Sequence, residues 1–441
     1  MIGIDNIHPR VLIVGTVPYD KNMSSRAFDA YFHNWEKENL RQFFSNPNQP
    51  LKGHCSSLYQ ITDQMMLARR FKKTANVGIL YNYDELPNSR DVSSKGSRNG
   101  IIGKLYALGR KKTSLNRLAR KWLWKEKYWN TEKFRNWIDE FAPECVFLAF
   151  SDDFFINRIA LFIADRFGIP IMTCIGDDYY FNDKRSLSPF YCSYRKQYKK
   201  TIDRVFAHKC SAIYISDKIR DKYNREFSIK GDTVYLTSDI PRKEFSPINV
   251  ESPKITYCGN IRLGRNHSIV DVANALSEIN KDYKVEVFSP ECDSKYTKVL
   301  ENCSNVVFHG AIPYDDVIKV FKESDVVLIV EGFEEKDVNL TRYSLSTKAA
   351  DSITSGCQIL TYGSSECGVI EYMKGTGCSM VCTDRSHLVA SIKTLMDDVA
   401  LQKKLYDRSY EILMENHSIE KSNKKAERLF EELLNGDDSG V

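Results

Sequence analysis

The sequence predicts an α/β protein made of two doubly wound, parallel-sheet, Rossmann-like domains. Short apolar runs typical of buried strands alternate with stretches of helical character along the chain. The length of 441 residues exceeds what one hydrophobic core serves and suits two domains of roughly 200 residues each. A segment at 239–253 contains three prolines and no periodicity, so we expect it to link the domains.

The first half opens with the apolar run Val11–Val14 and Gly15, a pattern typical of a buried strand that ends in a turn. Residues 154–167 carry apolar side chains at helical spacing, and the glycine and proline that follow indicate where this helix ends. We assign residues 1–245 to this domain. Its other expected strands are Val77–Leu80, Cys145–Ala149, Ile169–Cys174, Ala212–Ile215 and Thr233–Leu236.

The second half alternates strands and helices more regularly, and we assign residues 246–417 to a second domain. Residues 418–441 predict a helix that crosses back to the first domain, followed by a polar tail. Ligands bind beyond the carboxyl ends of the strands in such sheets, so two facing domains place the site in the cleft between them. The expected strands are Ile255–Cys258, Val285–Phe288, Val306–Phe308, Val326–Val330, Gln358–Thr361 and Ser379–Cys382.

The composition narrows the class of protein. Hydrophobic residues make up 42% and charged residues 27%, which is ordinary for a soluble protein. The chain has no long apolar run and no signal-peptide pattern at its start, so we expect a cytoplasmic location. Twelve cysteines are scattered without a CxxC pair. This spacing argues against a zinc site and against a disulfide scaffold, and we expect no bound metal.

A glycine-rich loop with two arginines follows the first strand of the second domain. It reads Gly259-Asn260-Ile261-Arg262-Leu263-Gly264-Arg265, and a helix is expected to begin near His267. Glycine lets the backbone approach a phosphate, and a helix N-terminus offers unpaired N–H groups to an anion. Arginine adds a positive fork that suits phosphate oxygens. The loop is typical either of phosphate binding or of a glycine turn with surface arginines.

A second helix start carries a lysine at an unfavourable position. Ser346 or Thr347 is placed to cap this helix, so that Lys348 lies in its first turn. The helix dipole opposes a positive charge there, at a cost under about 1 kcal/mol. A bound anion removes this conflict, whereas an exposed lysine only tolerates it. The position of Lys348 therefore favours an anion site, with a tolerated surface lysine as the alternative.

The order of these segments resembles the donor half of family-4-type glycosyltransferases of the GT-B fold. Ser346-Thr347-Lys348, then Asp351, then Ser355-Gly356 resembles their donor site, and the loop 259–265 resembles their phosphate loop. The segment 309–314 resembles the part that lies at the nucleobase, which implies donor contact by Ile312. The similarity of order and spacing covers about residues 137–435, whereas residues 1–136 match only as a generic α/β half.

The resemblance implies a nucleotide diphosphate sugar as donor, transfer with retained configuration, and no metal or cofactor. Arg265 and Lys348 are the expected catalytic cations, which neutralise the leaving diphosphate together with Arg262 and two helix N-termini. Glu366 follows another strand end and is expected to contact the ribose or the sugar. The expected donor-binding residues are Gly259, Asn260, Arg262, Gly264, Ile312, Ser346, Thr347, Asp351 and Glu366.

Acidic residues mark the departures from the family pattern. The family often has two glutamates eight positions apart in the donor site, but here Asp351 takes the second position and Tyr343 the first. The pairs Asp152-Asp153 and Asp177-Asp178 lack the DxD spacing of a metal site, and acids at strand ends commonly order loops. We expect Asp177 to reach the cleft, as a third catalytic residue that contacts or polarises the acceptor.

The leading hypothesis is a hexosyltransferase-like enzyme that acts on a saccharide or lipid-linked acceptor in surface polysaccharide or glycolipid synthesis. A nucleotide-sugar 2-epimerase shares the architecture, but it needs acid–base groups that the sequence does not supply as a set. A non-catalytic protein that binds sugar nucleotides or assists assembly is the third hypothesis. The departures at Tyr343 and Asp351 keep that hypothesis open.

A basic segment distinguishes the first domain. Residues 104–127 hold nine Lys or Arg and one acidic residue, in a chain whose net charge is +5. Within it, Leu115, Leu118, Ala119 and Trp122 recur at helical spacing. The pattern predicts either peripheral contact with an anionic membrane surface or a core helix with a solvated basic face. No nucleic-acid-binding module accompanies the segment, so nucleic acid is not an expected partner.

Overall fold

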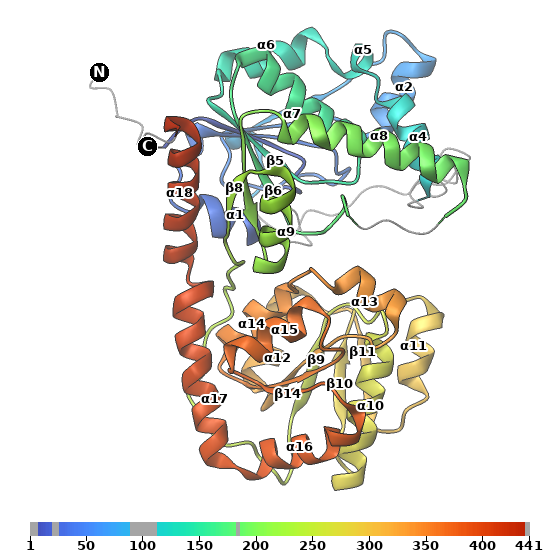
Figure 1. Ribbon diagram of the computed structural model, residues 1–441, viewed down its shortest axis with the longest axis vertical. Coiled ribbons are helices and arrows are strands. Elements are labelled where there is room, and N and C mark those ends of the chain that lie inside the picture. Colours follow the sequence, from blue (N-terminus) through green and yellow to red (C-terminus); the bar gives the residue numbers. More distant parts are fainter. Residues whose placement is uncertain (1–7, 20–25, 89–112, 182–185, 437–441) are drawn as a thin grey trace. The chain divides into compact units, whose positions relative to one another are not determined.

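The computed structural model describes residues 8–19, 26–88, 113–181 and 186–436, which form two compact units (Figure 1). Unit 1 comprises the described parts of Met1–Tyr214, Arg220–Thr233 and Asn423–Val441. Unit 2 comprises Ile215–Ile219 and Val234–Ser422. The chain therefore passes into unit 2 after Thr233, ahead of the boundary at residue 245 that the sequence suggested.

Unit 1 is built on an eight-stranded sheet in the order β4-β3-β2-β1-β5-β6-β7-β8. Neighbouring strands are parallel except β4, which pairs with β3 in the antiparallel sense at one edge. The strands are β1 Val11–Val14, β2 Leu40–Phe44, β3 Ser57–Gln60, β4 Ile79–Asn82, β5 Cys145–Ala149, β6 Ile171–Ile175, β7 Cys210–Tyr214 and β8 Lys230–Thr233.

Helices cover this sheet around an aromatic core. The helix α7 confirms the predicted range of 154–167, and it ends at Gly168 in the left-handed conformation. The helices of the unit are α1 Arg26–Phe32, α2 Asp63–Phe71, α4 Ser114–Leu123, α5 Glu126–Trp129, α6 Glu132–Phe141, α7 Phe154–Phe167, α8 Pro189–Phe206 and most of α9 Asp217–Phe227, with 3-10 turns η1 Lys37–Asn39 and η2 Tyr83–Glu85.

Two strands of unit 1, β2 and β3, were not expected from the sequence because polar residues interrupt their apolar pattern. The side chain of Gln42 is buried in β2, where its amide donates to the Thr16 carbonyl at 2.8 Å. Gln60 is buried in β3 and donates to the Asn46 carbonyl at 2.7 Å. Since a buried amide is tolerated only when it is hydrogen-bonded, the tertiary structure and not the local pattern permits these strands.

Unit 2 is built on a six-stranded parallel sheet in the order β11-β10-β9-β12-β13-β14. Residues of β12 alternate between two cores: Leu328 faces the core shared with α10 and α16, and Val327 faces the core shared with α14 and α15. A sheet covered on both faces explains the uninterrupted apolar strands seen in the sequence. The strands are β9 Ile255–Cys258, β10 Val285–Phe288, β11 Val306–Gly310, β12 Val326–Val330, β13 Gln358–Tyr362 and β14 Met380–Cys382.

The helices of unit 2 follow its strands in a regular βα order. They are α10 Arg265–Ile279, α11 Ser294–Glu301, α12 Tyr314–Glu323, α13 Glu335–Thr341, α14 Thr347–Ser355, α15 Gly368–Thr376, α16 Leu388–Asp397 and α17 Val399–Ile412, with the turns η3 Arg385–His387 and η4 Leu413–His417. The long helix α18 Ile419–Asn435 begins in unit 2 and continues in unit 1 from Asn423.

The proline-rich segment at 239–253 is held against unit 2 by hydrogen bonds. The Lys243 amide donates to the Ser355 carbonyl at 2.9 Å, and Arg242 donates to the Ile353 carbonyl at 2.9 Å. The Ile248 amide donates to the side chain of Gln402 at 3.0 Å. These bonds explain why the unit boundary lies earlier in the chain than composition suggested. Among the described residues, every helix is too short or too polar to cross a bilayer.

Candidate functional site

The centre of the sheet in unit 2 places two strand ends beside each other. From β9 the chain proceeds to β10 and β11 on one side, whereas β12, β13 and β14 extend the sheet on the other. The connections that leave β9 and β12 therefore separate at their carboxyl ends, which is the position where open α/β sheets bind ligands. The glycine loop 259–264 follows β9, and Glu331-Gly332 follows β12.

Glycines allow the backbones of these two loops to touch. A Cβ atom at Gly332 would lie 2.5 Å from the Leu263 carbonyl oxygen, and one at Gly264 would lie 2.9 Å from the Gly332 Cα. Gly264 also has a φ of 77°, in the left-handed region that favours glycine. Leu263 has a φ of 59°, which costs a residue with a side chain about 1–2 kcal/mol. Strain of this kind is often concentrated at functional sites.

Arg265 begins α10 and is paired with a buried carboxylate. Its Nε and Nη2 atoms donate to the two oxygens of Glu331 at 3.0 and 2.8 Å. The side chains of Arg265 and Glu331 are 12% and 1% exposed. Burial disfavours the charged guanidinium, but the Glu331 carboxylate outweighs this effect and raises the pKa of Arg265. The guanidinium is thus charged and held in one orientation at the end of β12.

Lys348 lies in the first turn of α14, and Ser346 is the N-cap of that helix, as the sequence predicted. The lysine extends towards β9, because a Cβ atom at Gly259 would lie 3.1 Å from the lysine Nζ. The same Nζ donates to the Tyr257 hydroxyl at 3.1 Å. Burial, with repulsion from Arg265 as a second cause, lowers the pKa of Lys348 to about 8. Two cations and two helix N-termini therefore converge near the carboxyl end of β9.

The outer predicted residues form ion pairs that differ in exposure, because the Glu291 side chain is 7% exposed and that of Glu366 is 63% exposed. Arg262 pairs with Glu291, with Nη2 donating to the carboxylate at 3.1 Å, and Asn260 accepts a bond from the Arg262 amide at 2.7 Å. Glu366 is exposed and accepts from Arg342 at 2.6 Å. An exposed pair such as that of Glu366 contributes only about 0–1 kcal/mol, so a ligand can displace it at low cost.

Three of the remaining predicted residues belong to unit 2, and the fourth belongs to unit 1. Thr347 is exposed beside the cap of α14. Asp351 is buried one turn later and accepts from the Ser238 hydroxyl at 2.7 Å. Ile312 is half-buried in the loop after β11, two strands away from β9. Asp177 belongs to unit 1, where it follows β6 and accepts from the Tyr179 hydroxyl at 3.0 Å.

Sequence reasoning did not assign a role to Glu331 or to Tyr257. Glu331 does not fit the spacing of eight positions that the family's two glutamates have. A different observation could have identified it: an acidic residue that directly follows five apolar strand residues lies at the carboxyl edge of the sheet. Tyr257 donates to the Asn260 carbonyl at 2.5 Å, so its hydroxyl links Lys348 to the glycine loop.

The acidic pair at 152–153 has a structural partner that the sequence did not reveal. Arg117 bonds Asp152, and Arg120 donates to Asp153 at 2.6 Å. The expectation that these acids only order the loop at a strand end is therefore incomplete, because they neutralise arginines of α4. Within the described part of the chain, no group of three or more His, Cys, Asp or Glu side chains is arranged to hold a metal ion.

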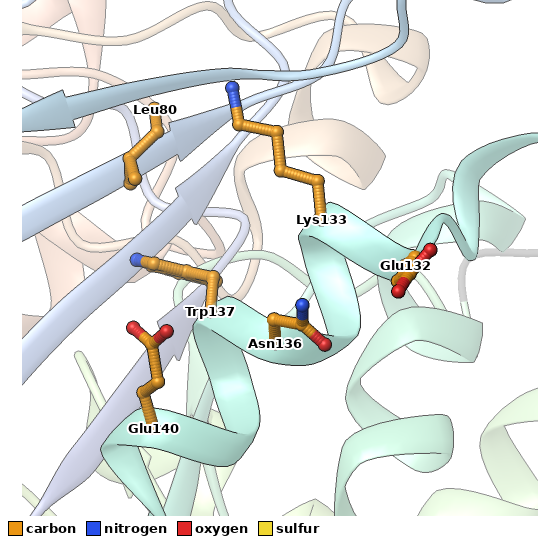
Figure 2. A pocket seen from close by; sticks show the side chains of 6 residues that line it. All are labelled: Leu80, Glu132, Lys133, Asn136, Trp137 and Glu140. Carbon is orange, nitrogen blue, oxygen red and sulfur yellow. The ribbon is translucent and has the colours of Figure 1, made fainter.

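A pocket of about 430 Å³ lies in unit 1, at the sheet edge formed by β4 (Figure 2). Figure 2 shows Leu80 of β4 on one side and side chains of α6 on the other. The residues that line it are Leu80, Glu132, Lys133, Asn136, Trp137 and Glu140. None of the predicted site residues belongs to this pocket, and its Lys133 and Glu140, both on α6, carry opposite charges.

Comparison with solved structures identifies proteins of the same fold. A glycosyltransferase from Rickettsia africae aligns with a TM-score of 0.58 at 11% identity, covering 98% of this chain and 100% of that one. Anabaena HepE, in complex with UDP-glucose, aligns with a TM-score of 0.56 at 12% identity, covering 96% of this chain and 100% of that one.

A UDP-forming trehalose-phosphate synthase from Burkholderia vietnamiensis aligns with a TM-score of 0.54 at 9% identity, over 97% of this chain and 100% of that one. These alignments and the two parallel-sheet units show that the chain has the GT-B architecture. No protein-family model matches the sequence. No curated protein matches it either.

Proposed function

We propose that this protein is a glycosyltransferase that takes a sugar from a nucleotide diphosphate donor bound to unit 2. The observation that carries the proposal is that Arg265 and Lys348 converge at the carboxyl end of β9. The sheet continues from β9 with β10 and β11 on one side and with β12, β13 and β14 on the other. Both cations lie in the first turn of a helix, so their charges add to the positive ends of two helix dipoles. This arrangement suits a ligand with two adjacent phosphates.

Glycosyl transfer requires stabilisation of the charge that develops on the leaving diphosphate as the bond to the sugar breaks. The guanidinium of Arg265 is held rigidly by Glu331 and supplies a fixed positive charge without reorganisation. The amine of Lys348 supplies a second positive charge. A bound phosphate raises the pKa of this amine and so keeps it protonated. We propose that these groups act without a metal ion and that the sugar keeps its configuration, as the family resemblance implies.

Other parts of the proposal concern the acceptor. We assign the acceptor to the class of saccharides or lipid-linked saccharides, with a place in surface polysaccharide or glycolipid synthesis at the cytoplasmic side of a membrane. Asp177 is proposed to contact or polarise this acceptor from unit 1. The common fold with HepE and trehalose-phosphate synthase, whose names record UDP-glucose binding and UDP formation, supports the nucleotide diphosphate donor.

The first experiment incubates the full chain with a panel of UDP-, GDP-, ADP- and dTDP-sugars, with and without saccharide acceptors. We expect acceptor-dependent release of one nucleoside diphosphate. Conversion of a donor to its epimer would replace the proposal by a 2-epimerase. Calorimetric binding of a sugar nucleotide without turnover would replace it by a non-catalytic sugar-nucleotide-binding protein.

The second experiment tests the site itself. Arg265→Ala and Lys348→Ala should each lower kcat/KM at least tenfold, corresponding to about 1.4 kcal/mol or more of lost transition-state stabilisation. The matched control is Lys254→Ala, which removes an exposed lysine of unit 2 that pairs with Glu323 at 2.9 Å. Wild-type kcat/KM and donor affinity in both site variants would show that the diphosphate binds elsewhere.

A further inference from the structure

The helix α4 presents its apolar side chains to solvent and its charged side chains to the protein. Leu115, Ala119 and Trp122 are spaced four and three residues apart, so they form one stripe on the helix. All three are exposed, with Leu115 and Trp122 each 55% accessible. An ordinary surface helix buries this stripe and exposes its charges.

The opposite face of α4 carries the cations. Arg117 bonds Asp152 and donates to the Tyr194 hydroxyl at 2.5 Å. Arg120 bridges Asp153 at 2.6 Å and Asp63 at 3.2 Å. These pairs fix the rotation of the helix about its axis, because turning it to bury the apolar stripe would expose three buried or half-buried acids and leave them unpaired.

The neighbouring helix α2 extends the exposed apolar surface. The Arg70 guanidinium lies 3.1 Å from the centre of the Trp122 ring, and the next residue, Phe71, is 85% exposed. Figure 1 shows α2, α4 and α5 grouped at one corner of unit 1. Three aromatic or aliphatic side chains of this size are therefore directed to solvent from two adjacent helices.

Exposed lysines surround this apolar surface. Lys72 and Lys73 follow Phe71 directly, and Lys125 lies between α4 and α5. All three are exposed, and among the described residues their side chains form no ion pair. The corner thus combines an apolar stripe, an interfacial tryptophan and unpaired positive charges, which is the chemistry that an anionic lipid surface attracts.

We propose that Leu115, Trp122 and Phe71 insert into an anionic lipid surface, with Lys72, Lys73 and Lys125 at the phosphate headgroups. The small size of the stripe favours this occupant over a second protein. A helix of ten residues is about 15 Å long, whereas a stable dimer buries about 800 Å² on each partner. This proposal is independent of the donor chemistry of unit 2.

The tryptophans make the proposal directly measurable. All five lie in the described residues, and Trp35, Trp124, Trp129 and Trp137 are at most 6% exposed. Trp122 is therefore the tryptophan whose fluorescence responds to a change outside the protein. Mixed phosphatidylcholine–phosphatidylglycerol vesicles should shift its emission to the blue, and brominated lipids should quench it. Trp122→Phe should remove both responses while leaving vesicle binding nearly intact.

Co-sedimentation with vesicles measures the binding itself. Leu115→Ser combined with Trp122→Ser should weaken binding roughly tenfold or more, because the insertion of two large side chains is lost. Replacing each lysine by glutamine should weaken it roughly fivefold, and salt should have a similar effect. The matched control is Val399→Ser combined with Tyr410→Ser on α17, whose side chains are 47% and 50% exposed.

Four outcomes would overturn the proposal. One is equal binding to anionic and neutral phosphatidylcholine vesicles, and another is unchanged binding of the Leu115–Trp122 double variant. A dimer in sedimentation that the same double variant dissociates would assign the surface to a second copy. Protection of Trp122 from acrylamide in monomeric protein without vesicles would assign it to another part of the same chain. Unaltered donor turnover in the double variant would separate this test from that of the transferase.

Discussion

Replacing Lys348 by methionine should stabilise the free protein while removing donor binding. Each pKa unit corresponds to about 1.4 kcal/mol, so a fall from the ordinary 10.5 to about 8 costs the folded protein about 3 kcal/mol at neutral pH. Methionine has a similar shape and no charge, so Lys348→Met removes this cost. The Tyr257 hydroxyl loses a donor but keeps its bond to the Asn260 carbonyl. A net gain of about 2 kcal/mol is therefore expected.

Differential scanning calorimetry is the appropriate assay, because all five tryptophans precede residue 215 and none reports on the sheet of unit 2. A gain of about 2 kcal/mol should raise the transition of this unit by about 4–8 °C. In wild-type protein, UDP should raise the same transition through its preferential binding to the folded state. In Lys348→Met that ligand-induced shift should disappear. Lys348→Met is thus expected to lose donor binding and to gain stability towards unfolding.

The pH dependence separates this charge effect from a simple change in packing. The folded pKa of Lys348 lies below the unfolded value, so its unfavourable contribution is complete below pH 8 and disappears as pH rises towards 10.5. The advantage of the methionine variant should fall by about 1.4 kcal/mol for each pH unit above 8. Lys254→Met, which removes an exposed lysine, should show no such trend between neutral pH and 9.5. A variant less stable than wild type at pH 7, or a difference constant with pH, would refute the reasoning.

Three further outcomes are expected. Glu331→Gln leaves Arg265 buried without a counter-charge, which should lower stability by about 3 kcal/mol in calorimetric unfolding; unchanged stability would contradict the role of the pair. Gly332→Ala should abolish UDP binding with far-UV circular dichroism preserved, whereas Gly375→Ala, whose Cβ meets open space, should bind normally. UDP affinity of the wild type should fall as pH rises above 8, because Lys348 then loses its proton; a flat profile from pH 7 to 9 would exclude it as a phosphate ligand.

The sequence predicted those strands and helices whose own residues determine their structure. Uninterrupted apolar runs identified β1 and β12, and the spacing in α7 together with its glycine identified a whole helix. The unfavourable lysine at the start of α14 predicted an anion site from local electrostatics alone, and Lys348 does lie in the first turn of that helix. The strands β2 and β3 could not be found in this way, because hydrogen bonds from distant loops are what permit buried glutamines there.

Charge pairs between distant segments account for the rest of what the sequence concealed. Arg117 and Asp152 are 35 residues apart, and Arg120 and Asp63 are 57 apart. In the sequence the basic segment and the acidic pair therefore look unrelated. In the structure the arginines of the segment neutralise the aspartates of the pair. This pairing turns the apolar stripe of α4 outward, so the alternative of a core helix with a solvated basic face is wrong. The predicted residues 104–112 lie outside the described residues.

Glu331 reduces the net positive charge of the candidate site in unit 2 and fixes the orientation of Arg265. Arg265, Lys348, Glu331 and Asp351 bring two positive and two negative groups to one sheet edge, so the site is nearly neutral before a ligand arrives. The site is therefore not expected to attract an anion strongly over long distances. Glu331 occupies Nε and Nη2 of Arg265, and among the described residues no bond is formed by Nη1. The Glu331 carboxylate thereby offsets part of the positive charge of Arg265, but it fixes the direction in which Nη1 can donate. We therefore expect such a site to select a diphosphate by the geometry of its oxygens more than by its total charge.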